Sequence, residues 1–108
     1  MSAPNALRQY QQQAVLSASP EILIDKLYGI GVSAAHAGDA SRTQRVLVEL
    51  MSALDRERGG EIAERLLGLY EFSIRAASRG DLEVVAEILE GLRDAWRDAM
   101  RAPVAIAA

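Results

Sequence analysis

The sequence has no cysteine and only one histidine, His36, among its 108 residues. Without cysteine the chain can form neither a disulfide bond nor a thiolate metal site. A hydrolytic triad needs a base beside its nucleophile, and a di-iron bundle needs paired Glu-x-x-His motifs, so a single histidine argues against both. His36 falls near the end of a predicted helix, where a cation is favourable. We therefore expect no catalytic residues, no metal, no cofactor and no enzymatic activity.

Clustered positive charge and long apolar runs are also missing. The chain has 12 basic and 15 acidic residues and a net charge of -3, which gives nucleic acid phosphates no cationic surface to bind. No apolar run approaches the roughly 20 residues that a membrane-spanning helix needs. Only Met1 precedes the polar start of the chain, so we see no secretory signal. We expect a cytoplasmic protein that neither binds nucleic acid nor inserts into a membrane.

The chain does contain residues that typically begin and end helices. Half of its residues are apolar, and a single domain spanning residues 1–108 can bury roughly two-thirds of its unfolded surface. Ser19 is a good helix cap and Pro20 suits the first helical position, whereas Gly38 and Gly80 suit helix ends. The pair Gly59-Gly60 is expected to end the second helix. The predicted helices cover residues 20–37, 41–58, 61–79 and 82–101.

Apolar residues recur at intervals of three and four in each predicted helix, as in the seams of a helical bundle. Short glycine-containing connections between such helices favour antiparallel neighbours. The sequence therefore predicts an all-α fold, an antiparallel up-down-up-down four-helix bundle over residues 20–101. Residues 1–16 either dock on this bundle as a short helix or await a partner. The predicted core comprises Leu23, Leu27, Ile30, Ala34, Val46, Leu47, Leu50, Leu54, Ile62, Ala63, Leu66, Tyr70, Ser73, Ala77, Val85, Leu89, Leu92, Trp96 and Ala99.

Several other apolar residues lie outside these apolar helix faces. A small bundle gains nothing from a phenylalanine in water, so such residues form either a broad edge of the core or a groove for a partner. Gly68 belongs with them because a missing side chain lets another backbone approach closely. The candidate partner-binding residues are Val32, Val48, Met51, Gly68 and Phe72. By contrast, the acids Asp25, Glu49, Glu61 and Glu64 are interpreted as solvated.

Three segments together resemble the flagellin-specific export chaperones of the FliS family. The first runs from Leu7 to Tyr28 and includes Tyr10-Gln11-Gln12, Ser17-Ala18-Ser19-Pro20 and Leu27-Tyr28. The second includes Leu54-Asp55, Gly59-Gly60-Glu61-Ile62-Ala63 and Leu69-Tyr70-Glu71, and the third includes Glu90 and Leu92-Arg93-Asp94-Ala95-Trp96. The order and mutual spacing of these segments, which cover roughly residues 5–100, are more specific than any one motif.

The resemblance implies a four-helix bundle that binds the C-terminal helical region of flagellin. Such a chaperone prevents premature polymerisation and assists delivery to the type III flagellar export apparatus, by binding an apolar helix in a groove. Its partners would be flagellin, in a 1:1 complex, and a component of the export gate. Leu7 and Tyr10 match the N-terminal segment that covers part of the cargo surface and docks on the gate. Free, the chaperone is expected to be a monomer or a weak dimer.

The sequence departs from the family pattern in two places. The first two helices are shorter than is usual in the family, which would shorten the cargo groove. Gly29 replaces an acid, and we expect it to cost about 1 kcal/mol of helix stability relative to alanine while permitting close helix packing. Two alternatives remain open: a helical adaptor, regulator or dimerising bundle that binds a different amphipathic helix, and a secretion chaperone for another cargo.

Overall fold

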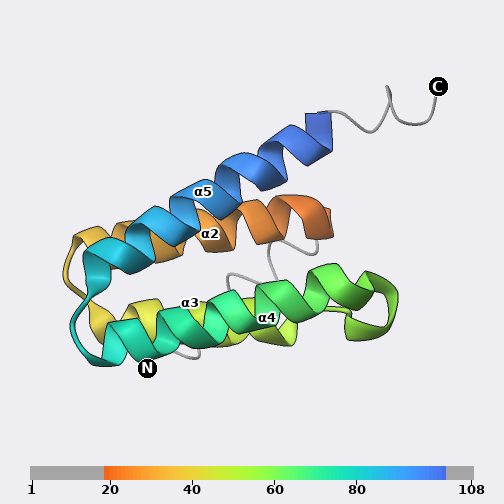
Figure 1. Ribbon diagram of the computed structural model, residues 1–108. Coiled ribbons are helices and arrows are strands. Elements are labelled where there is room, and N and C mark those ends of the chain that lie inside the picture. The colour runs from red at the N-terminus through yellow and green to blue at the C-terminus, as the bar shows by residue number, and fades with distance from the viewer. Residues whose placement is uncertain (1–18, 102–108) are drawn as a thin grey trace, which may run out of the picture.

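The computed structural model describes residues 19–101, which fold into four α-helices with no strand in that range (Figure 1). They are α2 (Pro20–His36), α3 (Ala40–Ser52), α4 (Arg56–Ser78) and α5 (Leu82–Arg101). Each helix packs against its neighbours in sequence, and α2 packs along α5 to close the bundle. Figure 1 shows α2 and α5 as one layer and α3 and α4 as the other. The predicted all-α, up-down-up-down fold class is confirmed.

The first helix begins and ends where the sequence places it, within one residue. The Ser19 side chain accepts a hydrogen bond from the Ile22 backbone N–H (3.4 Å), and Pro20 is the first helical residue. The helix ends at His36, followed by Gly38 with φ of 75°. A positive φ of this kind is easily adopted by glycine and allows the tight reversal into α3.

The second helix is shorter than predicted, because it ends at Ser52 and not near Arg58. Asp55 begins a new helical turn, its carboxylate accepting a hydrogen bond from the Arg58 backbone N–H at 3.1 Å. Gly60 then has φ 51° and ψ -126°, which kinks α4 after its first turn. The glycine pair therefore marks a kink inside α4, and the cap that separates α3 from α4 is Asp55.

The core lies between the two layers and contains most of the predicted seam residues. Fully buried members include Leu27, Leu47, Tyr70 and Leu89. Gly31 lets α2 and α5 approach closely, since a Cβ there would lie 2.8 Å from Leu89 Cδ1. A missing side chain at this point of contact brings the backbone of α2 near α5.

Two predicted core positions are wrong, and two acids predicted to be solvated, Asp25 and Glu49, are partly buried. Ile62 is 70 % exposed, because the buried face of α4 is centred on Ala63 and Tyr70 and no helix covers its border after the kink. Ala99 is exposed in the last turns of α5, where α5 has diverged from α4 (Figure 1). Asp25 is partly buried, with its side chain 16 % exposed, because two arginines of α5 pair with it. No helix within residues 19–101 is long and apolar enough to span a bilayer.

Candidate functional site

An exposed apolar face runs along α4. Ile62, Leu69 and Phe72 are 70 %, 39 % and 41 % exposed, and their spacing of seven and three places them on one face of the helix. We call these three residues the α4 stripe. Gly68, one turn before Phe72, is also exposed, and a Cβ there would meet nothing within 4 Å. The surface of the helix at Gly68 is therefore open beside the stripe.

The α4 stripe faces away from α3. The opposite flank of α4 contacts α3 through Gln44, whose amide donates to the Ile74 carbonyl (3.4 Å) and to Ser78 Oγ (2.9 Å). Phe72 precedes Ile74 by two residues, which is about 200° around a helix. Among the four pairs of neighbouring helices, α4 and α5 make the least extensive contact, and the stripe lies on the side of α4 away from α3.

The residues predicted to bind a partner lie on three separate faces. Gly68 and Phe72 lie together on α4. Val48, 52 % exposed, and the half-buried Met51 follow Gln44 at intervals of four and seven, so they lie on the side of α3 that borders α4. Val32 was expected to lie outside the apolar face of its helix. Instead it is half-buried and packs against the core. Leu7 and Tyr10 lie outside the described residues.

A cavity of about 350 Å³ opens at the end of the bundle where α2 and α4 begin and α3 and α5 end. We call it the end cavity. Its lining is mostly apolar and comes from all four helices and the α3–α4 connection: Ile24, Tyr28, Leu50, Ala53, Leu54, Asp55, Arg58, Gly59, Ile62, Ala63, Leu66, Tyr70 and Trp96. Ile62 belongs both to this lining and to the α4 stripe, so the two apolar surfaces are continuous. Sequence reasoning missed the cavity because its walls come from segments far apart in the chain.

Two tyrosines of the end cavity's lining bond to each other, and the lining also includes the charged residues Asp55 and Arg58. The Tyr28 and Tyr70 hydroxyl oxygens lie 2.6 Å apart, and each side chain is about 2 % exposed. Burial raises the pKa of both phenols, because the low-dielectric interior disfavours the phenolate. The pair therefore stays neutral, and one hydroxyl donates to the other across the α2–α4 interface.

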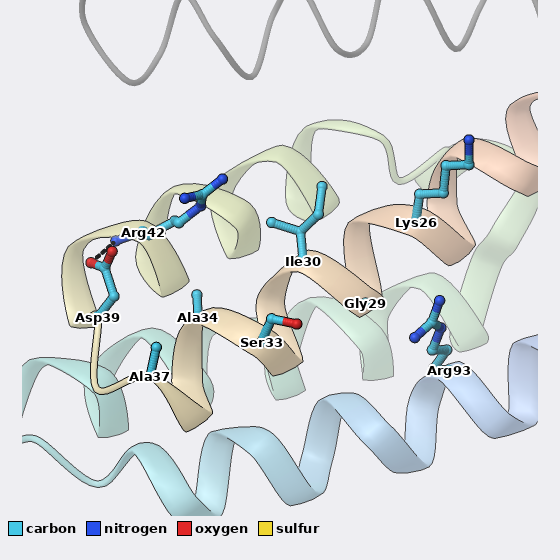
Figure 2. Close-up of a pocket in the computed structure, with 9 residues that line it drawn as sticks. All are labelled: Lys26, Gly29, Ile30, Ser33, Ala34, Ala37, Asp39, Arg42 and Arg93. Atoms are coloured by element: carbon cyan, nitrogen blue, oxygen red, sulfur yellow. Dashed lines mark hydrogen bonds between the residues drawn. The ribbon is translucent and has the colours of Figure 1, made fainter.

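A second hollow, of about 600 Å³, is lined by α2 together with Asp39, Arg42 and Arg93 (Figure 2). Two of its charged groups have structural partners. The Asp39 carboxylate caps α3 by accepting from the Arg42 backbone N–H at 3.0 Å. Arg93 reaches over Gly29, where a Cβ would lie 2.8 Å from the guanidinium, to pair with Asp25. The glycine thus makes room for an ion pair, and the hollow has no convergent set of groups for catalysis.

Ion pairs join α5 to α2. Asp25 Oδ1 accepts from Arg97 Nε at 2.7 Å and from Arg93 Nε at 3.3 Å. The hydrogen bond from Arg97, then that from Arg93, holds the pKa of the Asp25 carboxyl below its usual value despite partial burial. Near the far end of α2, His36 Nε2 lies 2.8 Å from Glu90 Oε1. Among residues 19–101 no three potential metal ligands cluster. Glu61 and Glu64 form exposed ion pairs with Arg65 and Arg56, as their interpretation as solvated acids expects, whereas Glu49 is half-buried.

Comparison with known proteins places this architecture in one family. Residues 33–103 match the family model described as flagellar protein FliS. The chain is 34 % identical over 114 positions to the flagellar secretion chaperone FliS of Campylobacter jejuni subsp. jejuni serotype O:6, covering 86 % of this chain and 89 % of the relative. It is 31 % identical over 123 positions to the flagellar secretion chaperone FliS of Salmonella typhimurium, covering 90 % and 91 %. No solved structure matches the chain.

Proposed function

Because the chain belongs to the flagellar protein FliS family, whose relatives are secretion chaperones, we propose that it is an export chaperone for flagellin. In this role it binds the C-terminal helical region of flagellin in the cytoplasm and keeps that region from polymerising. It then assists delivery to the type III flagellar export apparatus. The work is done by binding alone, without catalysis.

The observation that carries the proposal is the α4 stripe. Three large apolar side chains stand exposed along one face of a well-formed helix, beside Gly68. An amphipathic helix recognises such a face through its own residues at intervals of three, four and seven. A filament subunit's terminal helix is apolar because it is buried in the assembled filament, so before export it needs a substitute surface of this kind.

The remaining predicted contacts extend the same proposal. Val48 and Met51, with Val32 beyond them, would meet a second part of the cargo on α3 and α2. Leu7 and Tyr10 would cover the cargo surface in the free chaperone and dock on an export gate component. One cargo molecule per chaperone is expected, because each chain offers one α4 stripe among its described residues.

The test is a calorimetric titration of the protein with a peptide spanning the C-terminal helical region of flagellin. Saturable 1:1 binding is expected. Phe72→Asp places a charge in the centre of the proposed contact and should weaken binding by at least tenfold, since burying an unpaired charge costs more than about 1.4 kcal/mol. Val48→Asp examines the α3 surface separately.

A matched control keeps the charge change constant. Ser41→Asp adds the same charge at an exposed position in the first turn of α3, where an acid favours the helix. It should leave peptide affinity unchanged. A folded protein that does not bind the peptide at high concentration would reject the flagellin proposal. Equal weakening by Ser41→Asp and Phe72→Asp would reject the α4 stripe as the contact surface.

A further inference from the structure

The layer formed by α2 and α5 carries opposite charges side by side. The hollow on α2 is lined by three cations and one acid: Lys26, Arg42, Arg93 and Asp39 (Figure 2). On α5, acids recur at intervals of four and three along one exposed face: Glu83, Glu87, Glu90 and Asp94. We call these four acids the α5 ridge. Glu90 Oε1 lies 2.8 Å from His36 Nε2 of α2, so the ridge runs beside the helix that forms the hollow.

Opposite charges on neighbouring parts of one surface make that surface complementary to a second copy of itself. We propose that two copies of the chain pair through their α2–α5 layers, with the α5 ridge of each copy against the hollow of the other. A two-fold contact of this kind is isologous, so the pairing of hollow with ridge occurs twice. A partner of another kind would match only one of the two charged areas at a time.

The symmetry also fixes which residues meet. When the two-fold axis runs parallel to the helices, a residue of α2 faces the other copy's α5 at the height where it borders α5 in its own chain. Asp25 contacts Arg93 and Arg97 within the chain, which places the next residue, Lys26, level with Asp94. The pairing therefore brings Lys26 of each copy to Asp94 of the other.

The second cation of the hollow meets the other end of the ridge. A Cβ at Gly31 would lie 2.8 Å from Leu89 Cδ1, so Ser33, two residues further along α2, is level with Glu87. Arg42 lines the same hollow as Ser33 and lies toward the opposite end from Lys26 (Figure 2). Glu87 of the other copy would therefore approach Arg42. The remaining cation, Arg93, is already held by Asp25.

The hollow has room for a helix because its floor is made of small side chains. Ser33, Ala34 and Ala37 line it, and none of them extends far from the backbone of α2. On the α5 ridge, Gly91 stands between Glu87 and Asp94, and a Cβ there would meet nothing within 4 Å. The two helix backbones can therefore approach while the longer charged side chains pair at either end.

The size of the contact predicts a weak dimer. The 17 residues of α2 span about 25 Å, and two helices side by side are about 20 Å wide. The contact would bury about 500 Å² on each copy, or about 1,000 Å² in total, at the low end of specific interfaces. Its attraction comes from exposed charges, which salt screens. We therefore expect pairing only at high protein concentration, and less of it at high salt.

Pairing of the α2–α5 layers leaves the proposed cargo surface open. The α4 stripe lies on the other layer of the bundle, which this contact does not cover (Figure 1). The proposal therefore stands apart from the proposed function. Its test contains no flagellin, so a negative result leaves the export-chaperone proposal untouched.

The test is sedimentation equilibrium of the full chain at up to about 1 mM protein, at about 0.05 M and about 1 M salt. Lys26→Glu and Asp94→Lys each place like charges together at both symmetric contacts, so either change alone should weaken pairing at least tenfold. An equimolar mixture of the two variants restores opposite charges at both contacts. Pairing in the mixture should therefore return to within about threefold of the natural strength.

A matched control separates this contact from a general effect of charge. Arg65→Glu makes the same charge change as Lys26→Glu at an exposed position of α4, in the other layer, and should leave pairing unchanged. Circular dichroism checks that each variant keeps its helices. A monomeric mass at every concentration in low salt would overturn the proposal, as would a mixture that pairs no better than its components. Pairing that is lost in Phe72→Asp but kept in Lys26→Glu would assign the contact to the α4 stripe instead.

Discussion

At the scale of single residues, the hydroxyls of Tyr28 and Tyr70 form a polar contact between two helices inside the core. Removing one hydroxyl strands the other in a buried site, so Tyr28→Phe or Tyr70→Phe alone should cost about 1–2 kcal/mol of unfolding free energy. Removing both leaves no unpaired group, and the double variant should lose less than the sum of the two single losses. Urea denaturation of the four proteins measures this coupling. Additive losses would show that the hydroxyl contact does not stabilise the fold.

Asp25 gives the fold a predictable sensitivity to acid. Its folded-state pKa is lowered by Arg97 and Arg93, so its contribution to stability is present above the unfolded pKa of about 3.9 and is lost as pH falls through the folded pKa. Asp25→Asn should therefore cost about 1 kcal/mol at pH 7, a modest value because water screens both arginines. As the pH falls through the folded-state pKa of Asp25, the difference from the natural protein should diminish.

Denaturation midpoints at pH 7 and at pH 3 test the Asp25 prediction. The control is Glu64→Gln, which removes the exposed pair between Glu64 and Arg56 (2.8 Å). That change should alter stability by less than about 0.5 kcal/mol at either pH, because exposed ion pairs contribute little. A pH-independent loss in Asp25→Asn would mean that packing, and not the charge, is what the aspartate supplies.

At the scale of the helices, glycines with different surroundings should respond oppositely to substitution. In α4, Gly68→Ala should stabilise the protein by about 0.5–1 kcal/mol, since the new methyl meets nothing and alanine favours the helix. In α2, Gly31→Ala should destabilise it by about 1–3 kcal/mol, because the methyl would lie 2.8 Å from Leu89 Cδ1 and 3.2 Å from Val46 Cγ1.

Thermal or urea unfolding of these two variants settles the sign of each effect. Gly68→Ala also bears on cargo, because a close-packed helix would collide with the added methyl. Increased stability with weaker peptide binding would therefore support a helix lying against Gly68. Destabilisation by Gly68→Ala, or stabilisation by Gly31→Ala, would contradict the packing described for α4 and α2.

The helices themselves were largely predictable, because their end signals are local. Ser19 and Pro20 start α2, and Gly38 and Gly80 follow the ends of α2 and α4 as expected. The error at Gly59-Gly60 arose because a glycine pair can either end a helix or kink one, and the choice depended on the competing cap at Asp55.

Contacts between helices were less accessible to sequence reasoning. The pairing of Asp25 with Arg93 and Arg97 joins residues about 70 positions apart, so no local sequence pattern predicts this ion pair. The end cavity likewise requires all four helices to be placed before its walls meet. Exposure of Val48 and Phe72 followed from helix periodicity alone, yet their separation onto different faces followed only from the packing of α3 on α4.

At the scale of the whole molecule, the helices pack more closely at one end of the bundle than at the other. At one end the layers meet through Gly31, Val46 and Leu89 in close contact. At the other end they surround the end cavity, and the second half of α5 is held by Asp25 and the Glu21 carbonyl of α2. Local opening is therefore expected to begin in α5 after Leu92, the region that contributes Trp96 to the end cavity.

Hydrogen exchange of the Asp25→Asn variant tests whether α5 opens more readily than α3. Losing about 1 kcal/mol from the α2–α5 contact should raise the opening of α5 after Leu92 roughly five-fold at neutral pH. Exchange around Val46 in α3 should change little, because that region opens only when the whole bundle unfolds. Glu90→Gln, which removes the exposed contact with His36 at the tightly packed end, serves as the control and should leave α5 after Leu92 unaffected. Equal acceleration in α3 and α5 would mean that the two layers open as one unit, and the end cavity would then be no more accessible than the rest of the core.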